Sequence, residues 1–321
     1  MFPNTHFPKA KYYWYQGKLY DWSKAVLHPM LHGLHYGTAV FEGIRAYTTD
    51  RGPAIFRLPE HSDRLFHSAA VVQMPVSYKK EEVIAAIKTT MLKNKLEAAY
   101  IRPLLFYSYG NLGLVPKASP VELTIGCWEW GAYLGEKSAQ GVCVYVLPWR
   151  RIHFSQLQMT AKLSGTYVQS TICGLEARAQ KCDEAVFLNL EGRIAEGPGE
   201  NIFIFKDGVL RTNDKTESVL EGITRTSILE IARDLGHTTK IGPISKEDFF
   251  GADEAFFTGT AVEVIPIVRY RDASDTKKAV KEGSIGGGRP GRLTLELTQA
   301  YKDIVGGRNK AYERWLTYIR D

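Results

Sequence analysis

A polar stretch with three glycines, GAYLGEKSAQG, divides the sequence at residues 131–141. This composition is typical of a connector between domains. The chain also has 321 residues, which is long for a single small core. We therefore expect two domains, at residues 1–130 and 142–321, joined by this connector.

Both expected domains mix strand-like and helical segments, which favours a mixed α/β fold class. In the first domain, residues 54–58 (AIFRL) predict a strand, and Pro59 predicts the start of a helix. In the second domain, residues 184–212 predict a meander of strands, and a helix is expected just after Lys162. The apolar residues that share one face of that helix are Val168, Ile172, Leu175 and Ala179.

The composition argues against several functions. Hydrophobic residues make up 44% of the sequence but never form a run of 18 or more, so we expect no membrane-spanning helix. We also expect no secretory signal, because the first residues lack an apolar core. The net charge is +6, yet lysines and arginines are interleaved with acidic residues. This pattern suits an anionic small molecule better than nucleic acid.

The cysteines show neither CxxC spacing nor another pattern typical of metal sites or disulfide frameworks. We therefore expect reduced thiols in a cytoplasmic protein, and no metal. The four residues are Cys127, Cys143, Cys173 and Cys182.

Lys162 is the only ionised side chain between His153 and Glu176. Partial burial in such a neutral stretch would lower the pKa of its amine, because burial disfavours the ammonium form. A neutral amine can attack a carbonyl carbon and form a Schiff base. The simpler interpretation is a lysine whose stem packs while its amine reaches water. The choice between the two depends on the partners of the lysine.

Two further motifs could supply such partners. Glu196 and Glu200 lie among glycines in RIAEGPGENIF, where a carboxylate beside a pyridine nitrogen would keep that nitrogen protonated. Solvated turn residues are the alternative interpretation. Gly222, Ile223 and Thr224 begin a predicted helix, whose free N–H groups favour a phosphate. An ordinary helix cap would have the same sequence.

Taken together, these stretches resemble the branched-chain amino-acid aminotransferases, which belong to the fold type IV class of pyridoxal-phosphate enzymes. The resemblance extends from about residue 12 to about residue 305 and follows the family's order of motifs. It implies a mixed α+β fold of two domains with pyridoxal 5′-phosphate at their interface. The motifs are LHYGTAVFEGIRAY, EHSDRL, AYIRPL, WGAYLG, AK followed by GTY, EGPGENIF, GITR and GTAVE.

The resemblance implies a role for each residue of the cofactor site. Lys162 resembles the catalytic lysine that binds pyridoxal phosphate covalently and later carries a proton between Cα and C4′. Glu196 resembles the carboxylate that pairs with the pyridine nitrogen, and Tyr167 resembles the hydroxyl beside O3′. The residues that resemble the phosphate-binding group are Arg64, Gly222, Ile223, Thr224, Gly259 and Thr260.

The resemblance also implies a substrate pocket and a partner subunit. The amides of Thr260 and Ala261 would receive the α-carboxylate of the substrate. The loop of Leu112 and Leu114 would reach the site of a neighbouring subunit, so a homodimer or higher homo-oligomer is expected. Aromatic walls suit a branched side chain, and one arginine suits the distal carboxylate of glutamate. The pocket residues are Tyr36, Phe41, Tyr100, Arg102, Trp130 and Tyr133.

The expected activity is amino transfer from branched-chain L-amino acids (leucine, isoleucine, valine) to 2-oxoglutarate. The expected partners are these small molecules, without nucleic acid or membrane. The alternative is another fold type IV activity: a D-amino-acid or (R)-amine transaminase, or an aminodeoxychorismate lyase. The motifs AYIRPL and WGAYLG match the branched-chain group. The sequence departs from the family's usual residues at Thr166, Ala195 and Pro198, which bear on substrate range.

Overall fold

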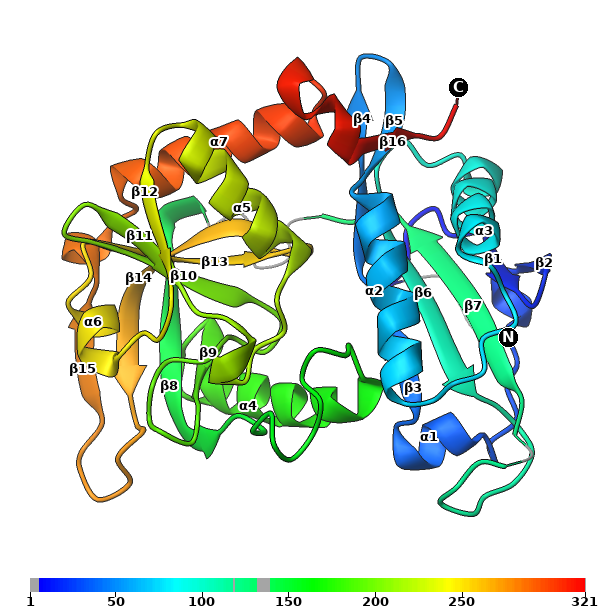
Figure 1. Cartoon of the computed structure of the whole chain (residues 1–321), viewed down its shortest axis with the longest axis horizontal. Helices are drawn as coiled ribbons and strands as arrows, with labels where there is room; N and C mark the ends of the chain where they lie inside the picture. The colour runs from blue at the N-terminus through cyan, green and yellow to red at the C-terminus, as the bar shows by residue number, and fades with distance from the viewer. Residues whose placement is uncertain (1–5, 118, 132–138, 321) are drawn as a thin grey trace. The chain divides into compact units, whose positions relative to one another are not determined.

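The computed structural model describes residues 6–117, 119–131 and 139–320. The chain divides into two compact units, each built around its own sheet (Figure 1). The first unit comprises Met1–Gly131, Ala161–Gly165 and Asp303–Asp321, and the second comprises Ala132–Thr160 and Thr166–Lys302.

These units differ from the continuous ranges expected from the sequence, because two later segments pair with strands of the first unit. Leu163 forms an isolated bridge with Val40. The strand β16 (Leu316–Tyr318) pairs with β5 (Gly52–Phe56). The segment that carries Lys162 therefore belongs to the first unit.

An antiparallel sheet of eight strands forms the frame of the first unit, with the order β16-β5-β4-β6-β7-β1-β2 and with β3 paired to β6. The strand predicted at 54–58 ends at Phe56, because Arg57 adopts a left-handed φ of 50° and turns the chain into a helix. The remaining strands are β1 (Tyr12–Tyr15), β2 (Lys18–Asp21), β3 (Ala39–Phe41), β4 (Ile44–Thr49), β6 (Ala99–Tyr107) and β7 (Val121–Trp128).

Two helices, α2 (Leu58–Val71) and α3 (Lys80–Asn94), pack against each other and against this sheet (Figure 1). Pro59 is in the first turn of α2, as the sequence predicts. A short helix, α1 (His32–Tyr36), precedes β3. The core between the helices and the sheet is apolar and includes Leu65, Ile87, Ile101 and Leu123.

A mixed sheet of eight strands forms the frame of the second unit, with the order β12-β11-β10-β13-β14-β8-β9 and with β15 paired to β14. β8 is parallel to its neighbours β9 and β14, and β11 is parallel to β12. The strands are β8 (Val142–Arg150), β9 (Glu184–Leu188), β10 (Asn201–Lys206), β11 (Val209–Thr212), β12 (Thr238–Ile241), β13 (Glu254–Gly259), β14 (Glu263–Asp272) and β15 (Lys281–Ser284).

The three strands predicted within 184–212 are present as β9, β10 and β11, but they do not form one meander. β10 and β11 form a hairpin, whereas β9 pairs with β8 instead of β10. The long loop between β9 and β10 separates the two strands. That loop carries Glu196 and Glu200.

Helices cover parts of the second sheet (Figure 1). The helix α4 (Tyr167–Ala179) packs on β8 and β9, and α5 (Ile223–Asp234) packs on β12 and β13. The predicted helix after Lys162 thus begins only at Tyr167, because Ser164–Thr166 form a 3₁₀ turn first. The other helices are α6 (Lys246–Phe250) and α7 (Arg292–Val305).

The apolar face predicted for α4 is not its buried face. Val168, Ile172 and Leu175 are exposed, and we call these three residues the α4 outer face. Cys173 and Ala177 are buried instead, where they pack with residues of β8 and β9. Small side chains allow the helix to approach the sheet closely, so the larger apolar residues point away from it.

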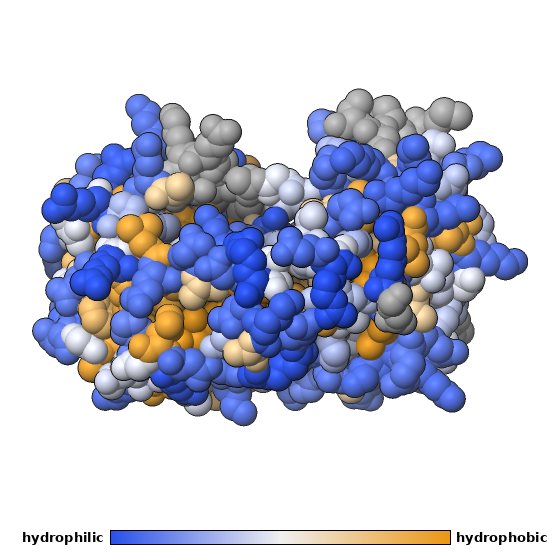
Figure 2. Space-filling view, turned by 90° about the horizontal axis from the view of Figure 1, so that it is seen from above, coloured by the Kyte–Doolittle hydropathy of each residue, from blue (hydrophilic) through white to orange (hydrophobic). Residues whose placement is uncertain are grey.

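The surface is mixed in character. Figure 2 shows one face of the molecule, on which hydrophilic residues surround smaller hydrophobic patches. Opposite charges meet on the surface, as in the ion pairs of Lys80 with Asp63 and of Arg308 with Asp303. Among the described residues, none of the helices combines the length and apolar character that a bilayer crossing requires.

Candidate active site

The backbone around Lys162 is held by two elements of the first unit. The Lys162 N–H donates to Ser68 Oγ on α2 at 2.9 Å, and the Lys162 carbonyl accepts from the Phe41 N–H on β3 at 3.2 Å. The side chain is half-buried, and its Nζ lies 4.8 Å from the centre of the Phe41 ring. An apolar ring thus shields one side of the amine.

Two glycines allow this segment to approach α1. Gly37 ends α1 with a left-handed φ of 64°, and its carbonyl accepts from the Gly165 N–H at 3.2 Å. A Cβ at Gly37 would lie 2.7 Å from the Gly165 Cα, which no real contact permits. Glycine is therefore required at position 37, both for its φ and for the space.

Aromatic and cationic side chains extend from Lys162 along the sheet of the first unit. The Arg102 guanidinium carbon lies 4.6 Å from the centre of the Phe41 ring, and its Nη2 donates to the Tyr100 hydroxyl at 3.0 Å. The Tyr100 ring lies 4.8 Å from that of Trp130. The structure therefore brings together Lys162 and four of the six residues predicted for the substrate pocket.

Gly43 makes room for this cluster. A Cβ at position 43 would lie 2.0 Å from the Tyr100 hydroxyl oxygen. The glycine in the FEG motif thus has a steric purpose that the sequence alone does not reveal.

Tyr36 and Tyr133 are not placed in that cluster. Tyr36 is 44% exposed, and its hydroxyl donates to the Leu112 carbonyl at 2.9 Å. It therefore lies with the loop of Leu112 and Leu114 rather than beside Phe41. Tyr133 lies outside the described residues.

Arg64 is held by a buried acid that the sequence analysis missed. Its Nε and Nη2 donate to the two carboxylate oxygens of Glu42 at 2.7 and 2.8 Å. The Nδ1 of His61 lies 2.8 Å from Glu42 Oε2, and since an ionised carboxylate only accepts, the histidine nitrogen is the donor. His61 and Arg64 are three residues apart on α2, on one side of the helix, which was the available sequence signal.

Burial and the neighbouring charges determine which of Glu42, Arg64 and His61 are ionised. Burial opposes ionisation of Glu42, but the positive charge of Arg64, together with hydrogen bonds from Arg64 and His61, holds the pKa of Glu42 well below its usual range. Burial lowers the pKa of His61 despite its carboxylate partner. At neutral pH the group is therefore an ion pair of Glu42 and Arg64, with a neutral imidazole beside it.

Glu196 is a buried carboxylate of the second unit, only 4% exposed. Its Oε1 accepts from Arg151 Nε at 2.9 Å, and its Oε2 accepts from the Leu220 N–H at 3.0 Å. Arg193 is close to Glu196 in the sequence but pairs with Glu217, whereas Arg151 reaches Glu196 from the end of β8. A buried carboxylate needs such a partner, because burial without one is costly.

Asn201 links the Glu196 loop to the start of α5. Its Nδ2 donates to the Leu220 carbonyl at 2.8 Å, and its Oδ1 accepts from the Gly222 N–H at 3.0 Å. A Cβ at Gly222 would lie 2.2 Å from that Oδ1. Only glycine therefore allows this connection, and no pattern in the sequence indicates the Asn201 contact.

The first turn of α5 offers free donors. Within the described part of the chain, no protein group accepts the N–H of Ile223 or of Thr224. Thr258 lies opposite Asn201 in the sheet, and its buried Oγ1 has no hydrogen-bond partner among the described residues. The turn with Gly259 and Thr260 follows directly. Helix N–H groups and a hydroxyl of this kind are suited to a phosphate.

Tyr167 lies on a helix that contacts Arg151 through another residue. It is the first residue of α4, and Gln169 on the same helix accepts from Arg151 Nη1 at 3.1 Å. Arg151 thus contacts both α4 and Glu196. Ala261, predicted to bind the substrate carboxylate, lies half-buried in the turn after β13.

Each unit, taken by itself, carries groups that suit part of a phosphorylated aromatic aldehyde. The first unit has a primary amine and two arginines, and the second has a buried carboxylate that suits a ring nitrogen and, among the described residues, unpaired donors that suit a phosphate. In residues 6–117, 119–131 and 139–320, no group of three or more His, Cys, Asp or Glu side chains could hold a metal ion.

Comparison with known proteins identifies the class. The model of the family described as amino-transferase class IV matches residues 39–270, and the chain belongs to this family. It is 42% identical to a branched-chain-amino-acid aminotransferase of Pseudomonas aeruginosa, over 96% of this chain and 97% of that protein.

Solved structures give the same result. The branched-chain amino acid aminotransferase of Escherichia coli superposes with a TM-score of 0.91 and 37% identity, covering 97% of this chain and 100% of that one. The branched-chain amino acid aminotransferase of Thermobaculum terrenum, in its PLP (pyridoxal phosphate) form, gives a TM-score of 0.87 and 30% identity, covering 97% of this chain and 99% of that one.

Proposed function

We propose that this chain transfers amino groups between branched-chain L-amino acids and 2-oxoglutarate, with pyridoxal 5′-phosphate as its cofactor. Leucine, isoleucine and valine are the donors, and branched-chain 2-oxo acids and L-glutamate are the products. The observation that carries the proposal is the cluster in which Lys162, Phe41 and Arg102 meet, because it combines a nucleophilic amine, an apolar wall and a cation. The names of the relatives support the same class of amino donor.

The residues that would hold the cofactor are those that fit its chemical groups. Glu196 would pair with the ring nitrogen, since its buried carboxylate lies beside Arg151 in a position to accept hydrogen bonds. Tyr167 would face the ring hydroxyl. When bound, pyridoxal phosphate supplies an electron sink for the charge that develops at the substrate Cα. The phosphate would be held by Arg64, Gly222, Ile223, Thr224, Gly259 and Thr260.

Lys162 would act as the base that removes the proton from the substrate Cα with its Nζ and later returns it. General base catalysis requires a positioned group with a suitable pKa. The backbone contacts with Ser68 and Phe41 provide the positioning.

Two unlike side chains must use one pocket, because both amino donor and acceptor react at the same place. Phe41, Tyr100 and Trp130 form apolar surface that suits leucine. Arg102 lies against two of these rings and could meet the distal carboxylate of glutamate, which would otherwise be desolvated without a partner. The amides of Thr260 and Ala261 would receive the α-carboxylate.

We infer that the chain acts as a homodimer or a higher homo-oligomer. The α4 outer face is apolar and exposed, and so are Leu112 and Leu114 in the loop contacted by Tyr36. Exposed apolar surfaces of this kind commonly mark protein–protein contacts. A cytoplasmic location is inferred from the cysteines, which are all free thiols.

A panel of amino donors tests the proposed function. The purified protein, loaded with pyridoxal phosphate, is assayed with 2-oxoglutarate and L-leucine, L-valine, D-alanine or an (R)-arylamine. We expect glutamate formation with the two branched-chain L-amino acids only. Preference for D-alanine or the (R)-arylamine would instead support another fold type IV activity, and release of pyruvate from aminodeoxychorismate would support the lyase.

A further inference from the structure

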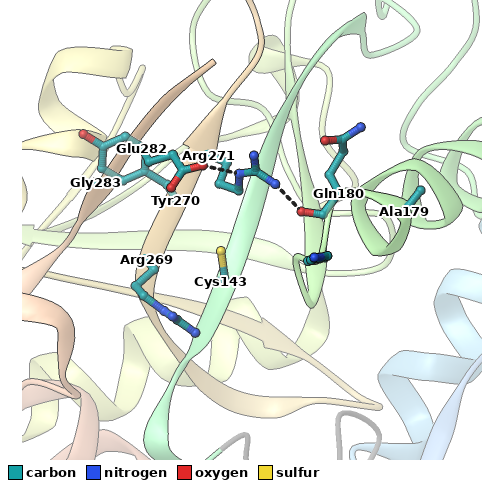
Figure 3. A pocket seen from close by; sticks show the side chains of 9 residues that line it. Cys143, Ala179, Gln180, Arg269, Tyr270, Arg271, Glu282 and Gly283 are labelled. Carbon is teal, nitrogen blue, oxygen red and sulfur yellow. Dashed lines mark hydrogen bonds and ion pairs between the residues drawn. The ribbon is translucent and has the colours of Figure 1, made fainter. Parts of the chain in front are cut away.

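A pocket lies in the second unit, beside β14 and the end of α4, and none of the residues assigned to the cofactor lines it (Figure 3). Its volume is about 500 Å³. Cys143 of β8 forms part of its wall, together with Arg269 and Arg271 of β14 and Gln180 after α4. Nothing in the proposed amino transfer uses these residues.

The sheet places the two arginines beside the cysteine. β8 and β14 are parallel, and Cys143 lies opposite Arg269 while Tyr145 lies opposite Arg271. Because side chains two residues apart point to the same side of a strand, Arg269, Arg271 and Cys143 share one face of the sheet. Figure 3 shows the Cys143 sulfur between the two arginine side chains.

A second thiol touches Cys143. The Sγ atoms of Cys143 and Cys182 are 3.1 Å apart, and both side chains are buried. The backbones also lie side by side, since the Asp183 N–H donates to the Cys143 carbonyl at 2.8 Å. Two cysteines with their sulfurs in contact and their backbones linked in this way can form a disulfide with little movement.

The surroundings distinguish the two thiols. The hydrogen bond from Cys182 and the charges of Arg269 and Arg271 lower the pKa of Cys143 against the opposing effects of burial and Asp183. The hydrogen bond to Cys143 and burial raise the pKa of Cys182. Arg269 forms no ion pair with the rest of the described chain, whereas Arg271 pairs with Glu282 at 2.8 Å. Cys143 is therefore the nucleophile of the pair.

We propose that Cys143 is a site of reversible oxidation by hydroperoxides and that Cys182 converts its oxidised form into a disulfide. Low-pKa thiols beside cations and next to a resolving cysteine are the thiols that peroxides oxidise. The open pocket gives a small peroxide access to Cys143, which is 7% exposed.

The chemistry balances in two steps. The Cys143 thiolate attacks one oxygen of hydrogen peroxide, the O–O bond breaks, and hydroxide leaves, so that Cys143 becomes a sulfenic acid. Cys182 then attacks the Cys143 sulfur, the S–S bond forms, the S–O bond breaks, and hydroxide leaves. With the protons of the two thiols, two waters are released. Two thiols are oxidised for one peroxide reduced.

The test uses the full chain loaded with pyridoxal phosphate. The protein is treated with hydrogen peroxide, the remaining thiols are alkylated, and the digested peptides are analysed by mass spectrometry. We expect a peptide pair joined through Cys143 and Cys182, which dithiothreitol separates again. In Cys182→Ser, we expect a sulfenic acid at Cys143 that dimedone traps. Arg269→Gln should slow the loss of the Cys143 thiol severalfold.

Cys173 is the matched control, because it belongs to the same buried cluster and burial raises its pKa to about 11. It should stay alkylatable under the same treatment. The proposal is overturned if Cys143 is oxidised no faster than Cys173, or if Cys143 pairs with a cysteine other than Cys182. If a variant does not fold, the oxidation of the wild-type chain tests the proposal by itself. Neither outcome depends on whether the chain transfers amino groups.

Discussion

In the proposed function, the side chains around Arg102 would determine which substrates the first unit recognises. Arg102 lies over Phe41 and donates to the Tyr100 hydroxyl, so its guanidinium is held against an apolar wall instead of extending into water. Planar guanidinium groups stack well on aromatic rings and still donate from their edges. A single arginine can thus tolerate a leucine side chain and also bind a carboxylate.

We predict that Arg102→Leu weakens the half-reaction with L-glutamate or 2-oxoglutarate by at least about tenfold, because a hydrogen bond to a charged group contributes about 1.5–3 kcal/mol. The half-reaction with L-leucine should change much less. Single-turnover spectra of the cofactor measure each half-reaction separately. Equal losses for both substrates would mean that Arg102 is structural or binds the α-carboxylate.

The contribution of the Glu42 charge to the fold can be tested by measuring the free energy of unfolding. Removing its charge by Glu42→Gln leaves Arg64 without its buried partner, which typically lowers the free energy of unfolding by about 3–5 kcal/mol. Since the folded-state pKa of Glu42 is lowered, its stabilisation is present above the unfolded value of about 4.5 and is lost as pH falls below it.

The difference in unfolding free energy between wild type and Glu42→Gln should therefore shrink by about 1.4 kcal/mol between pH 7 and about pH 3.5, one unit below the unfolded pKa. Urea unfolding of both proteins at the two pH values measures this change in the difference. A difference that stays constant with pH would show that the mutation acts through packing alone.

At the scale of elements, the start of α5 depends on one glycine. Gly222 has its N–H bonded to Asn201 and leaves no space for a Cβ beside the Asn201 oxygen. Gly222→Ala must displace either Asn201 or the first turn of α5, which carries the unpaired N–H groups. We predict at least about tenfold weaker binding of pyridoxal phosphate.

Gly242→Ala is the matched control, because a Cβ there meets open space. Titration of each apoprotein with the cofactor, followed by absorbance, gives the two dissociation constants. The role assigned to the α5 turn would be wrong if Gly222→Ala bound the cofactor as tightly as Gly242→Ala does.

Local patterns in the sequence predicted where helices and strands lie better than they predicted which residues those elements contact. Pro59 marked the start of α2 correctly. Periodicity identified α4, but the apolar residues that it groups on one face are exposed, because hydrophobicity cannot show which side of a helix a sheet covers. We propose that another surface covers the exposed apolar face of α4.

At the scale of the whole molecule, the α4 outer face leads to a prediction about assembly. Light scattering of the wild-type chain should give at least the mass of a dimer. Ile172→Glu places a charge on that face and should shift the equilibrium towards monomer, because burying an unpaired charge is costly. Val280→Glu, at an exposed apolar position outside α4, should not. If the oligomer stays intact in Ile172→Glu, the α4 outer face is not the interface between subunits.

The division into units was the part of the architecture that the sequence could not predict. Lys162 lies in a five-residue segment, Ala161–Gly165, which belongs to the first unit although residues on both sides belong to the second. The bridge from Leu163 to Val40 and the contact of Gly165 with Gly37 cause this, and both join residues far apart in sequence. For the same reason Lys162 and Glu196 could be singled out by motif, whereas their partners Ser68 and Arg151 could not.

The most direct test of the account is a pair of half-reactions on one sample of the wild-type chain loaded with pyridoxal phosphate. Addition of L-leucine alone should convert the cofactor to its amine form, and later addition of 2-oxoglutarate should restore the original absorbance with release of L-glutamate. Lys162→Ala, which lacks the base, should show neither change at a measurable rate. A wild-type spectrum that L-leucine leaves unchanged, or Lys162→Ala converting as fast as wild type, would contradict the account.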